Sequence, residues 1–294
     1  MRLPWIFVVF LLLCLSTMGE ELVESTGLWA IDGDTIVVEI AGKRDELRIM
    51  GIDAVERQGC LGEEAVEFVQ ELITRAIWLE LDPEKGLERR DRNGRLLAHV
   101  FLAPVQTPGS LLAATLAREG FAKLDVRDVK DIWGEDYFDI RYTPWVIRAQ
   151  ILAALERRGW WGECDPFFDA DLVIAAIKHW GNDEIAYIVN RGAEPLDLAA
   201  GWALTSHPSQ TLDFGRYTRE LLLPPGWILR VHSGPVNSGR KGEFVVDREA
   251  GVIDWYWTGR KVWRREGDVA QLTFGETVVY EYRYPSLKAQ RLRR

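Results

Sequence analysis

Carboxylates and arginines gather in three short segments of the first third of the chain, each beside residues that favour a turn. The first segment has two aspartates around a glycine, the second begins with an arginine and ends with a glutamate, and the third ends with an arginine. The segments are Asp32-Gly33-Asp34-Thr35, Arg48 through Glu56 with Asp53 between them, and Asp91-Arg92-Asn93-Gly94-Arg95. Taken singly, each is typical of a solvated turn, a strand-end cation or a hairpin. The combination is the informative feature.

Hydrolysis of a phosphodiester requires such a set of groups. A carboxylate can act as general base toward the attacking water when it is held within reach. Arginine forks match pairs of phosphate oxygens, whose charge grows in the transition state. Aspartate oxygens suit a hard divalent cation, which neutralises phosphate. The residues therefore predict phosphodiester hydrolysis at a site supported by a cation.

Short β-prone runs and helical segments are expected to hold these groups. Three runs joined by Gly- and Asp-containing turns precede a segment, 63–81, whose apolar residues recur at helical spacing. The Asn93-Gly94 pair marks a tight hairpin turn before a further run. The runs are 26–31, 35–40, 45–52 and 96–102, and two more helices are expected over 111–120 and 144–158. This order predicts an OB-fold barrel of five strands with helices.

A change of pattern at 165–169 marks the expected end of this first domain. Beyond it, helical periodicity nearly vanishes, and short β-prone runs alternate with Gly-, Pro- and Asp-rich turns, as in an antiparallel sandwich. The chain is therefore predicted to be mainly β with some α. The expected parts are a signal peptide at 1–19, a catalytic barrel at 25–164 and a β-sandwich at 170–287.

The charge balance limits how such a chain can attract nucleic acid. The net charge is −9; residues 20–164 contain 18 basic and 28 acidic residues, whereas residues 165–294 contain 17 of each. Long-range attraction to phosphate is therefore missing in the catalytic half. Phosphate recognition must come from a local cluster of cations, with a bound metal ion as a further source of positive charge.

The start of the chain and its cysteines indicate export. An apolar run at 5–15 follows Arg2, which is the secretory pattern; an uncleaved anchor and a lipid attachment at Cys14 are the alternatives.

In an exported chain, Cys60 and Cys164 favour one disulfide, with two separate buried thiols as the alternative. The protein is expected to be secreted or held in the cell envelope, monomeric, and without a membrane span after signal cleavage.

The same motifs resemble the staphylococcal nuclease family. The resemblance adds Ala117-Arg118-Glu119-Gly120-Phe121-Ala122-Lys123 to the three segments above and spans roughly 25–162. It implies a five-stranded OB-type barrel that hydrolyses DNA and RNA with Ca²⁺ and leaves 3′-phosphate ends. The rival hypotheses are a catalytically inactive barrel that binds nucleic acid and a surface scaffold that acts through the sandwich.

The resemblance also implies roles for individual residues. The implied catalytic residues are Arg48, Glu56 and Arg95, and the implied Ca²⁺ ligands are Asp34, Asp53 and the main-chain carbonyl of Ala54. Glu56 corresponds to the general base that acts on water. Arg48 and Arg95 correspond to phosphate clamps, and Arg95 is also expected near the leaving oxygen. Asp32 corresponds to an acid that supports the ion through water.

Two regions depart from the family pattern. Val55 stands where the family usually has proline, which is expected to loosen the turn that carries the general base. Val126 and Asp128 stand where the family's type member has two tyrosines that help to hold the nucleotide. Trp133 or Tyr137 could supply that stacking, and ordinary core or surface aromatics are the alternative.

The segment 172–287 resembles the lamin tail domain, an immunoglobulin-like β-sandwich. The matching stretches are 184–190, 196–204, 223–226 and 262–272. The resemblance implies a tethering role and leaves the partner of the sandwich open. Trp255, Trp257 and Trp263 are expected in its core and rim, and an exposed binding patch is the alternative. The basic tail at 288–294 is expected to be a solvated end, with attraction to phosphate or membrane as the alternative.

Overall fold

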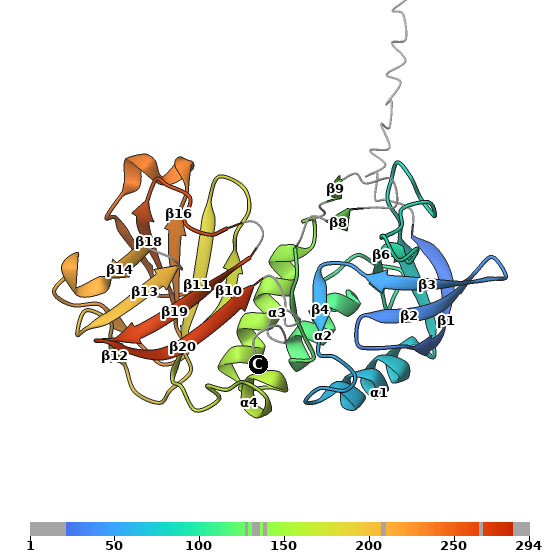
Figure 1. The fold of residues 1–294 in the computed structure, drawn as a ribbon, viewed down its shortest axis with the longest axis horizontal. Coiled ribbons are helices and arrows are strands. Elements are labelled where there is room, and N and C mark those ends of the chain that lie inside the picture. Colours follow the sequence, from blue (N-terminus) through green and yellow to red (C-terminus); the bar gives the residue numbers. More distant parts are fainter. Residues whose placement is uncertain are drawn as a thin grey trace, which may run out of the picture.

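The computed structural model describes residues 22–126, 129–130, 136–137, 140–206, 210–264 and 267–284. The expected signal peptide and the basic tail lie outside these residues. Figure 1 shows two β-rich parts side by side, with helices between them. Within the described part of the chain, no helix has both the length and the apolarity to cross a membrane.

Five strands close the N-terminal barrel in the order β1-β2-β3-β6-β5. They are β1 (Val23–Ala30), β2 (Thr35–Ile40), β3 (Lys43–Ile49), β5 (Ala76–Glu80) and β6 (Leu96–Phe101). Successive side chains of a strand point to opposite faces, and the inward ones, such as Ile36, Leu47 and Ile77, are fully buried. The prediction of a mainly β fold with a five-stranded OB-like barrel is confirmed.

The helices differ from prediction mainly at the end of the first one. The helices are α1 (Gly62–Ile73), α2 (Leu112–Glu119), α3 (Thr143–Leu155) and α4 (Trp160–Glu163). The helix predicted over 63–81 is too long, because its last residues form β5. Ile77 and Leu79 point into the barrel while β5 pairs with both β1 and β6, so barrel closure overrides the local helical spacing. Gly120 ends α2 with φ of 76°, as expected for a glycine cap.

Two short pairs of strands lie outside the barrel sheet. One pair is β4 (Ile52–Ala54) with β7 (Ala122–Leu124), and the other is β8 (Val129–Lys130) with β9 (Asp136–Tyr137). In the first pair Asp53 lies opposite Lys123. This antiparallel pair connects the segment after β3 to the segment after α2.

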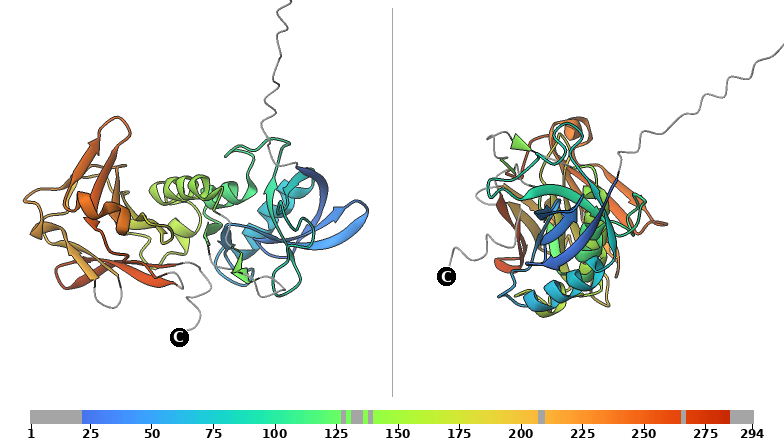
Figure 2. Two further views of the ribbon diagram at one scale, coloured as in Figure 1. Left: turned by 90° about the horizontal axis from the view of Figure 1, so that it is seen from above. Right: turned by 90° about the vertical axis from the view of Figure 1, so that its right-hand side faces the viewer.

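The C-terminal part contains two larger sheets, consistent with a β-sandwich. The five-stranded sheet consists of β10 (Leu172–Lys178), β11 (Glu184–Asn190), β16 (Ile228–Ser233), β18 (Val252–Thr258) and β17 (Phe244–Asp247). The four-stranded sheet consists of β14 (Gln210–Asp213), β13 (Trp202–Ser206), β19 (Asp268–Phe274) and β20 (Thr277–Tyr284). The shorter elements are β12 (Leu196–Asp197), β15 (Leu222–Leu223) and the 3₁₀ helices η1 (Phe214–Arg216) and η2 (Pro235–Arg240). Figure 2 shows this part from two further sides.

Aromatic side chains fill the C-terminal core. Trp255 is fully buried, and its ring lies 5.1 Å from that of Phe214 and 4.4 Å from that of Phe244. Trp257 and Trp263 are buried as well. These tryptophans therefore belong to the core and do not form an exposed patch.

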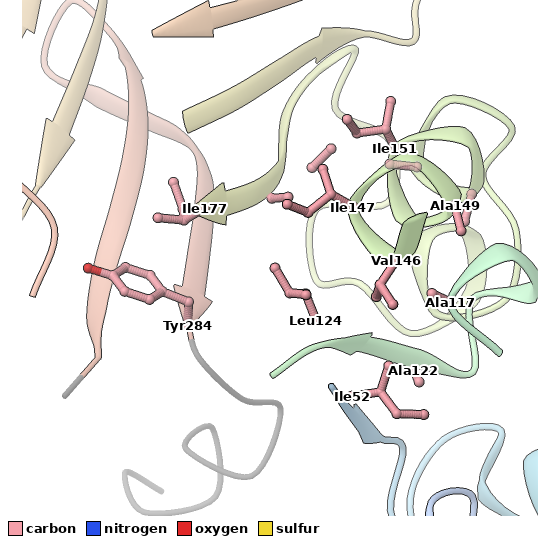
Figure 3. Packing of buried hydrophobic residues seen from close by; sticks show 14 of the residues in the cluster. Ile52, Ala117, Ala122, Leu124, Val146, Ile147, Ala149, Ile151, Ile177 and Tyr284 are labelled. Atoms are coloured by element: carbon pink, nitrogen blue, oxygen red, sulfur yellow. The ribbon is translucent and has the colours of Figure 1, made fainter. Parts of the chain in front are cut away.

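Helix α3 joins the two parts into one apolar core. It packs against α2 and β7 on one side and against β10 and β11 on the other. Figure 3 shows Leu124 and Ile147 facing Ile177 of β10. A single cluster of buried residues therefore continues from the barrel into the sandwich.

A buried glutamine makes the polar contacts in this junction. The carbonyl of Gln150 on α3 accepts a hydrogen bond from the main-chain N–H of Leu124 at 2.6 Å. Its amide donates to the Tyr282 hydroxyl at 2.9 Å and to the carbonyl of Ala175. One side chain thus satisfies groups of β7, β10 and β20, as burial requires.

Lys123 is buried at the same junction. Its Nζ lies 3.0 Å from the ring centroid of Trp160 and 5.1 Å from that of Tyr282. Burial lowers the pKa of Lys123 to about 7; the charge of Asp165 opposes this shift and that of Arg191 adds to it. The aromatic faces provide the attraction that a buried ammonium needs.

The segment that connects the two parts is held by Arg191. The guanidinium donates to four main-chain carbonyls at 2.7–3.1 Å, those of Trp161, Phe167, Phe168 and Ala170. The Tyr280 hydroxyl also donates to Asp165 at 3.0 Å. The connection is therefore tied to the sandwich along its length.

A disulfide closes the barrel part on itself. Cys60 and Cys164 are bonded, with their Cα atoms 5.9 Å apart and 104 residues between them in sequence. The bond joins the loop before α1 to the residue after α4. The predicted pairing is confirmed.

Replacing both cysteines by serine should lower the free energy of unfolding by about 3–5 kcal/mol, because a cross-link over a loop of this length restricts the unfolded chain. Urea unfolding of the two proteins at equal pH measures the difference. An unchanged midpoint would show that the unfolded chain gains nothing from the loss of the bond.

The free energy of unfolding of the wild type, relative to that of Lys123→Met, should rise between about pH 7 and pH 10. The folded pKa is about 7 against an ordinary 10.5, so between these values the unfolded chain binds the extra proton and stability increases with pH. Below pH 7 the difference should be constant. Unfolding titrations across this range test it, with Lys43→Met on the exposed surface as the control. Parallel curves for both variants would contradict the expectation.

Candidate active site

The buried carboxylate of Asp34 lies at the centre of the predicted site. Residues 31–35 form the turn between β1 and β2, where the N–H groups of Ile31 and Asp32 both donate to the carbonyl of Thr35. The turn points Asp34 inward, and its Oδ2 lies 2.7 Å from Nη1 of Arg48 and accepts the Ala54 N–H at 2.8 Å. One carboxylate therefore connects the first turn to β3 and β4.

Arg48, at the end of β3, reaches both predicted metal-ligating acids. Its Nη2 donates to the carbonyl of Ile52 at 2.8 Å and lies 3.6 Å from Oδ1 of Asp53. Gly51 makes the intervening turn possible with φ of 85°. Asp34 and Asp53 are at most 1% exposed, so the guanidinium supplies charge where water does not reach.

The pairing of β4 with β7 orients the main chain of Ala54. The Val55 N–H donates to the carbonyl of Phe121 at 2.9 Å, and residues 53 and 123 lie opposite each other. Because hydrogen-bonding direction alternates along a strand, the main-chain groups of Ala54 face the other way, toward Asp34. Val55 also makes a hydrogen bond that proline could not, since proline has no N–H.

Arg95 is held beside this cluster by a neighbour four residues earlier. Its Nε and Nη2 lie 2.7 and 2.6 Å from Oδ2 of Asp91, whose other oxygen accepts the N–H groups of Asn93 and Arg95. The remaining Nη1 donates to the Thr35 hydroxyl at 3.1 Å. Thr35 in turn donates to Asp34 at 3.2 Å. A chain of hydrogen bonds thus links both predicted phosphate clamps to one acid.

Glu56 is placed near this cluster by chain continuity. It follows Ala54 by two residues and is half-exposed. Its carbonyl accepts the Gly59 N–H at 2.7 Å, and a Cβ on Gly62 would come within 2.1 Å of that oxygen. The turn that carries Glu56 is therefore packed closely against the start of α1.

Asp32 borders the site and stays ionised at neutral pH. Burial raises the pKa of Asp32, but hydrogen bonds with Asp34 and Thr35 and the charge of Arg48 outweigh it, so the pKa is lowered. The main-chain N–H of Asp34 donates to Oδ1 of Asp32 at 2.9 Å. A third carboxylate charge thus lies beside the Asp34–Arg48 pair.

The predicted metal ligands are all oxygen donors. The carboxylates of Asp32, Asp34 and Asp53 share the charge of Arg48, while Arg95 is paired with Asp91. Among the described residues, no group of three or more His, Cys, Asp or Glu side chains is arranged to hold a metal. A cation here would therefore rely on two carboxylates and a main-chain carbonyl, all of them the oxygen ligands that Ca²⁺ prefers.

The sequence motifs predict the candidate catalytic groups but assign no role to two residues that orient them. Asp91 and Thr35 were part of the quoted motifs without a role of their own, although the spacing of Asp91 and Arg95 already permits an ion pair. Val126, one of the two departures from the tyrosine positions, is buried. Asp128 and the side chains of Trp133 and Tyr137 lie outside the described residues.

Comparison with known proteins supports a nuclease-type domain. Residues 46–161 match the family described as staphylococcal nuclease homologue. Endonuclease YncB of Bacillus subtilis (strain 168) is 38% identical over 111 residues, which cover 36% of this chain and 49% of that protein. Thermonuclease of Staphylococcus hyicus is 35% identical over 100 residues, which cover 32% of this chain and 54% of that protein.

These matches support a staphylococcal nuclease domain at residues 46–161. The chain spans about half the length of these two curated relatives. The matched family segment contains Arg48, Asp53, Glu56 and Arg95, whereas Asp34 precedes it. The contacts of Asp34 with Arg48 and Ala54 are what connect it to the matched segment.

Val55→Pro should lower the free energy of unfolding by about 1–3 kcal/mol, because it leaves the carbonyl of Phe121 without its donor. Val55→Ala is the matched control, since it keeps the N–H and removes only methyl groups. Thermal and urea unfolding compare the three proteins. A proline variant as stable as the wild type would mean that the hydrogen bond from Val55 to Phe121 contributes nothing to the free energy of unfolding.

Proposed function

We propose that this protein is a Ca²⁺-dependent endonuclease that hydrolyses phosphodiester bonds of DNA, RNA or both and leaves 3′-phosphate ends. The single observation that carries the proposal is the hydrogen-bonded chain from Arg95 through Thr35 and Asp34 to Arg48. Two guanidinium groups and a cluster of acids are thereby held in one place. The relatives named endonuclease and thermonuclease support the same reaction class.

Arg48 and Arg95 would bind the scissile phosphate. Each guanidinium offers several N–H donors in a plane, and charge on the phosphate oxygens increases as the attacking oxygen approaches. Asp91 holds Arg95 in a fixed orientation through two nitrogens. The side chain of Arg95 would therefore lose little conformational freedom when phosphate binds. Arg95 is assigned the position nearer the leaving oxygen.

Glu56 would act as general base. It takes a proton from a water molecule while the water oxygen bonds to phosphorus and the bond from phosphorus to the 5′ oxygen breaks. The 5′ oxygen takes a proton from solvent, and Glu56 releases its proton to solvent afterwards. This yields a 3′-phosphate and a 5′-hydroxyl. The rate is expected to rise toward alkaline pH, because hydroxide is the better nucleophile.

Asp34, Asp53 and the carbonyl of Ala54 would hold Ca²⁺, with Asp32 supporting the ion through water. When bound, the ion supplies positive charge that neutralises the phosphate. The excess of carboxylates over guanidinium groups at this buried position supports a divalent cation.

Export and the role of the sandwich belong to the same proposal. The Cys60–Cys164 bond supports secretion, since disulfides persist in oxidising compartments. The C-terminal part is assigned to a lamin tail-like domain, supported by its two sheets of mostly antiparallel strands around an aromatic core.

Glu56→Gln should reduce Ca²⁺-dependent cleavage of DNA by about 10²–10⁴-fold, the usual contribution of a general base. The assay is a gel of DNA incubated with protein and Ca²⁺ or with chelator. Glu64→Gln, on the exposed face of α1, is the matched control and should retain activity.

The two alternative functions predict different migration of the DNA in the gel. DNA that is retarded but intact with the wild-type protein and Ca²⁺ would indicate an inactive binding module. DNA that is neither cut nor retarded would indicate a scaffold whose function lies in the sandwich. A fully active Glu56→Gln variant would remove the general base from the proposal.

A further inference from the structure

A groove opens on the C-terminal part, away from the candidate active site. It has a volume of about 640 Å³ and is lined by Gln210, Thr211, Lys241, Trp257, Thr258 and Arg260. It lies between β14, an edge strand of one sheet, and the end of β18 in the other sheet. Both strands lie on the side of the sandwich that faces away from the barrel (Figure 1). Its size is within the usual range of ligand sites, roughly 300–1,000 Å³.

The chemistry of the groove favours an anion. Lys241 and Arg260 are exposed cations, and the other polar side chains are hydroxyls and an amide, which can all donate hydrogen bonds. Within the described part of the chain, no carboxylate lines this groove. Nearby Glu243 is already paired with Arg240 at 2.8 Å.

The main chain around both cations is fixed. The Arg260 N–H donates to the Thr258 hydroxyl at 3.3 Å, and its carbonyl accepts the Gly234 N–H at 2.9 Å. The Gly242 N–H, next to Lys241, donates to the carbonyl of Tyr256 at 2.7 Å. The two cations therefore extend from hydrogen-bonded backbone.

The floor of the groove does not offer a base-stacking surface. Trp257 is only 7% exposed. Recognition would therefore rest on charge and hydrogen bonds to a backbone, without the stacking that gives base preference.

We infer that this groove binds the phosphodiester backbone of nucleic acid and holds the substrate of the nuclease site. The inference rests on the proposed function. The catalytic half has ten more acidic than basic residues and cannot attract polyanions at long range, so substrate attraction has to come from another surface. The groove supplies two cations on a half of the chain whose charges balance.

The test is binding of a fluorescently labelled single-stranded oligonucleotide to the full-length chain in chelator, so that nothing is cleaved. The variant Lys241→Gln/Arg260→Gln should bind about tenfold more weakly than the wild type. The slope of log affinity against log salt should become shallower by about 1.4, or roughly 0.7 for each phosphate that the protein no longer neutralises.

The matched control is Arg219→Gln/Arg248→Gln, which removes the same charge from exposed positions outside the groove. It should leave the salt slope unchanged. Equal losses of affinity in both double variants would overturn the inference, because they would show a general charge effect. A groove variant that loses binding of a sulfated polysaccharide more than that of the oligonucleotide would overturn it as well.

Cleavage assays separate this inference from the proposed function. With Ca²⁺, the groove variant should show a raised KM for long single-stranded DNA and an unchanged kcat on a dinucleotide too short to span both sites. If the wild type cleaves neither substrate, the proposed function fails while the binding result still stands. If the wild type cleaves DNA and the groove variant matches the control in binding and KM, the inference fails and the function stands.

Discussion

The ion pair between Asp34 and Arg48 is the interaction on which the rest of the site depends. Burying a carboxylate costs several kcal/mol unless it is paired and hydrogen-bonded. Asp34 is paired at 2.7 Å and also accepts the Ala54 N–H, so the contacts that make its burial tolerable hold the turn before β2 against the end of β3 and against β4. Stability of the barrel and assembly of the candidate site are therefore the same requirement, and neither partner can be lost without leaving a buried charge.

The two halves of the chain differ in their balance of charged residues. The barrel brings Arg48 and Arg95 to one point, where they lie beside acids that outnumber them. The net negative charge of the barrel half favours binding of a cation and weakens the long-range attraction of phosphate groups. The sandwich carries no such excess of negative charge. If the proposed function and the inferred groove hold, substrate affinity would come from the second surface, and the barrel surface would serve the cation.

Local patterns in the sequence predicted much of the barrel and the three segments that the fold brings together around Asp34. The turn at 32–34, the glycine cap at Gly120 and the cysteine pair all follow from local rules or composition. The end of α1 did not, because β5 is selected by pairing with β1 and β6 rather than by its own periodicity. The contacts of Gln150 and Lys123 with Tyr282 join residues more than 130 positions apart, which no short spacing reveals.

The hold of Arg191 on the connecting segment has a geometric consequence. Four carbonyls on one guanidinium, together with the continuous apolar core at α3, hold the barrel against the sandwich. A strand anchored in the groove of the sandwich would reach the barrel over a path of constant length. The protein would then act as a molecular ruler, cutting at a set number of nucleotides from the point where it grips.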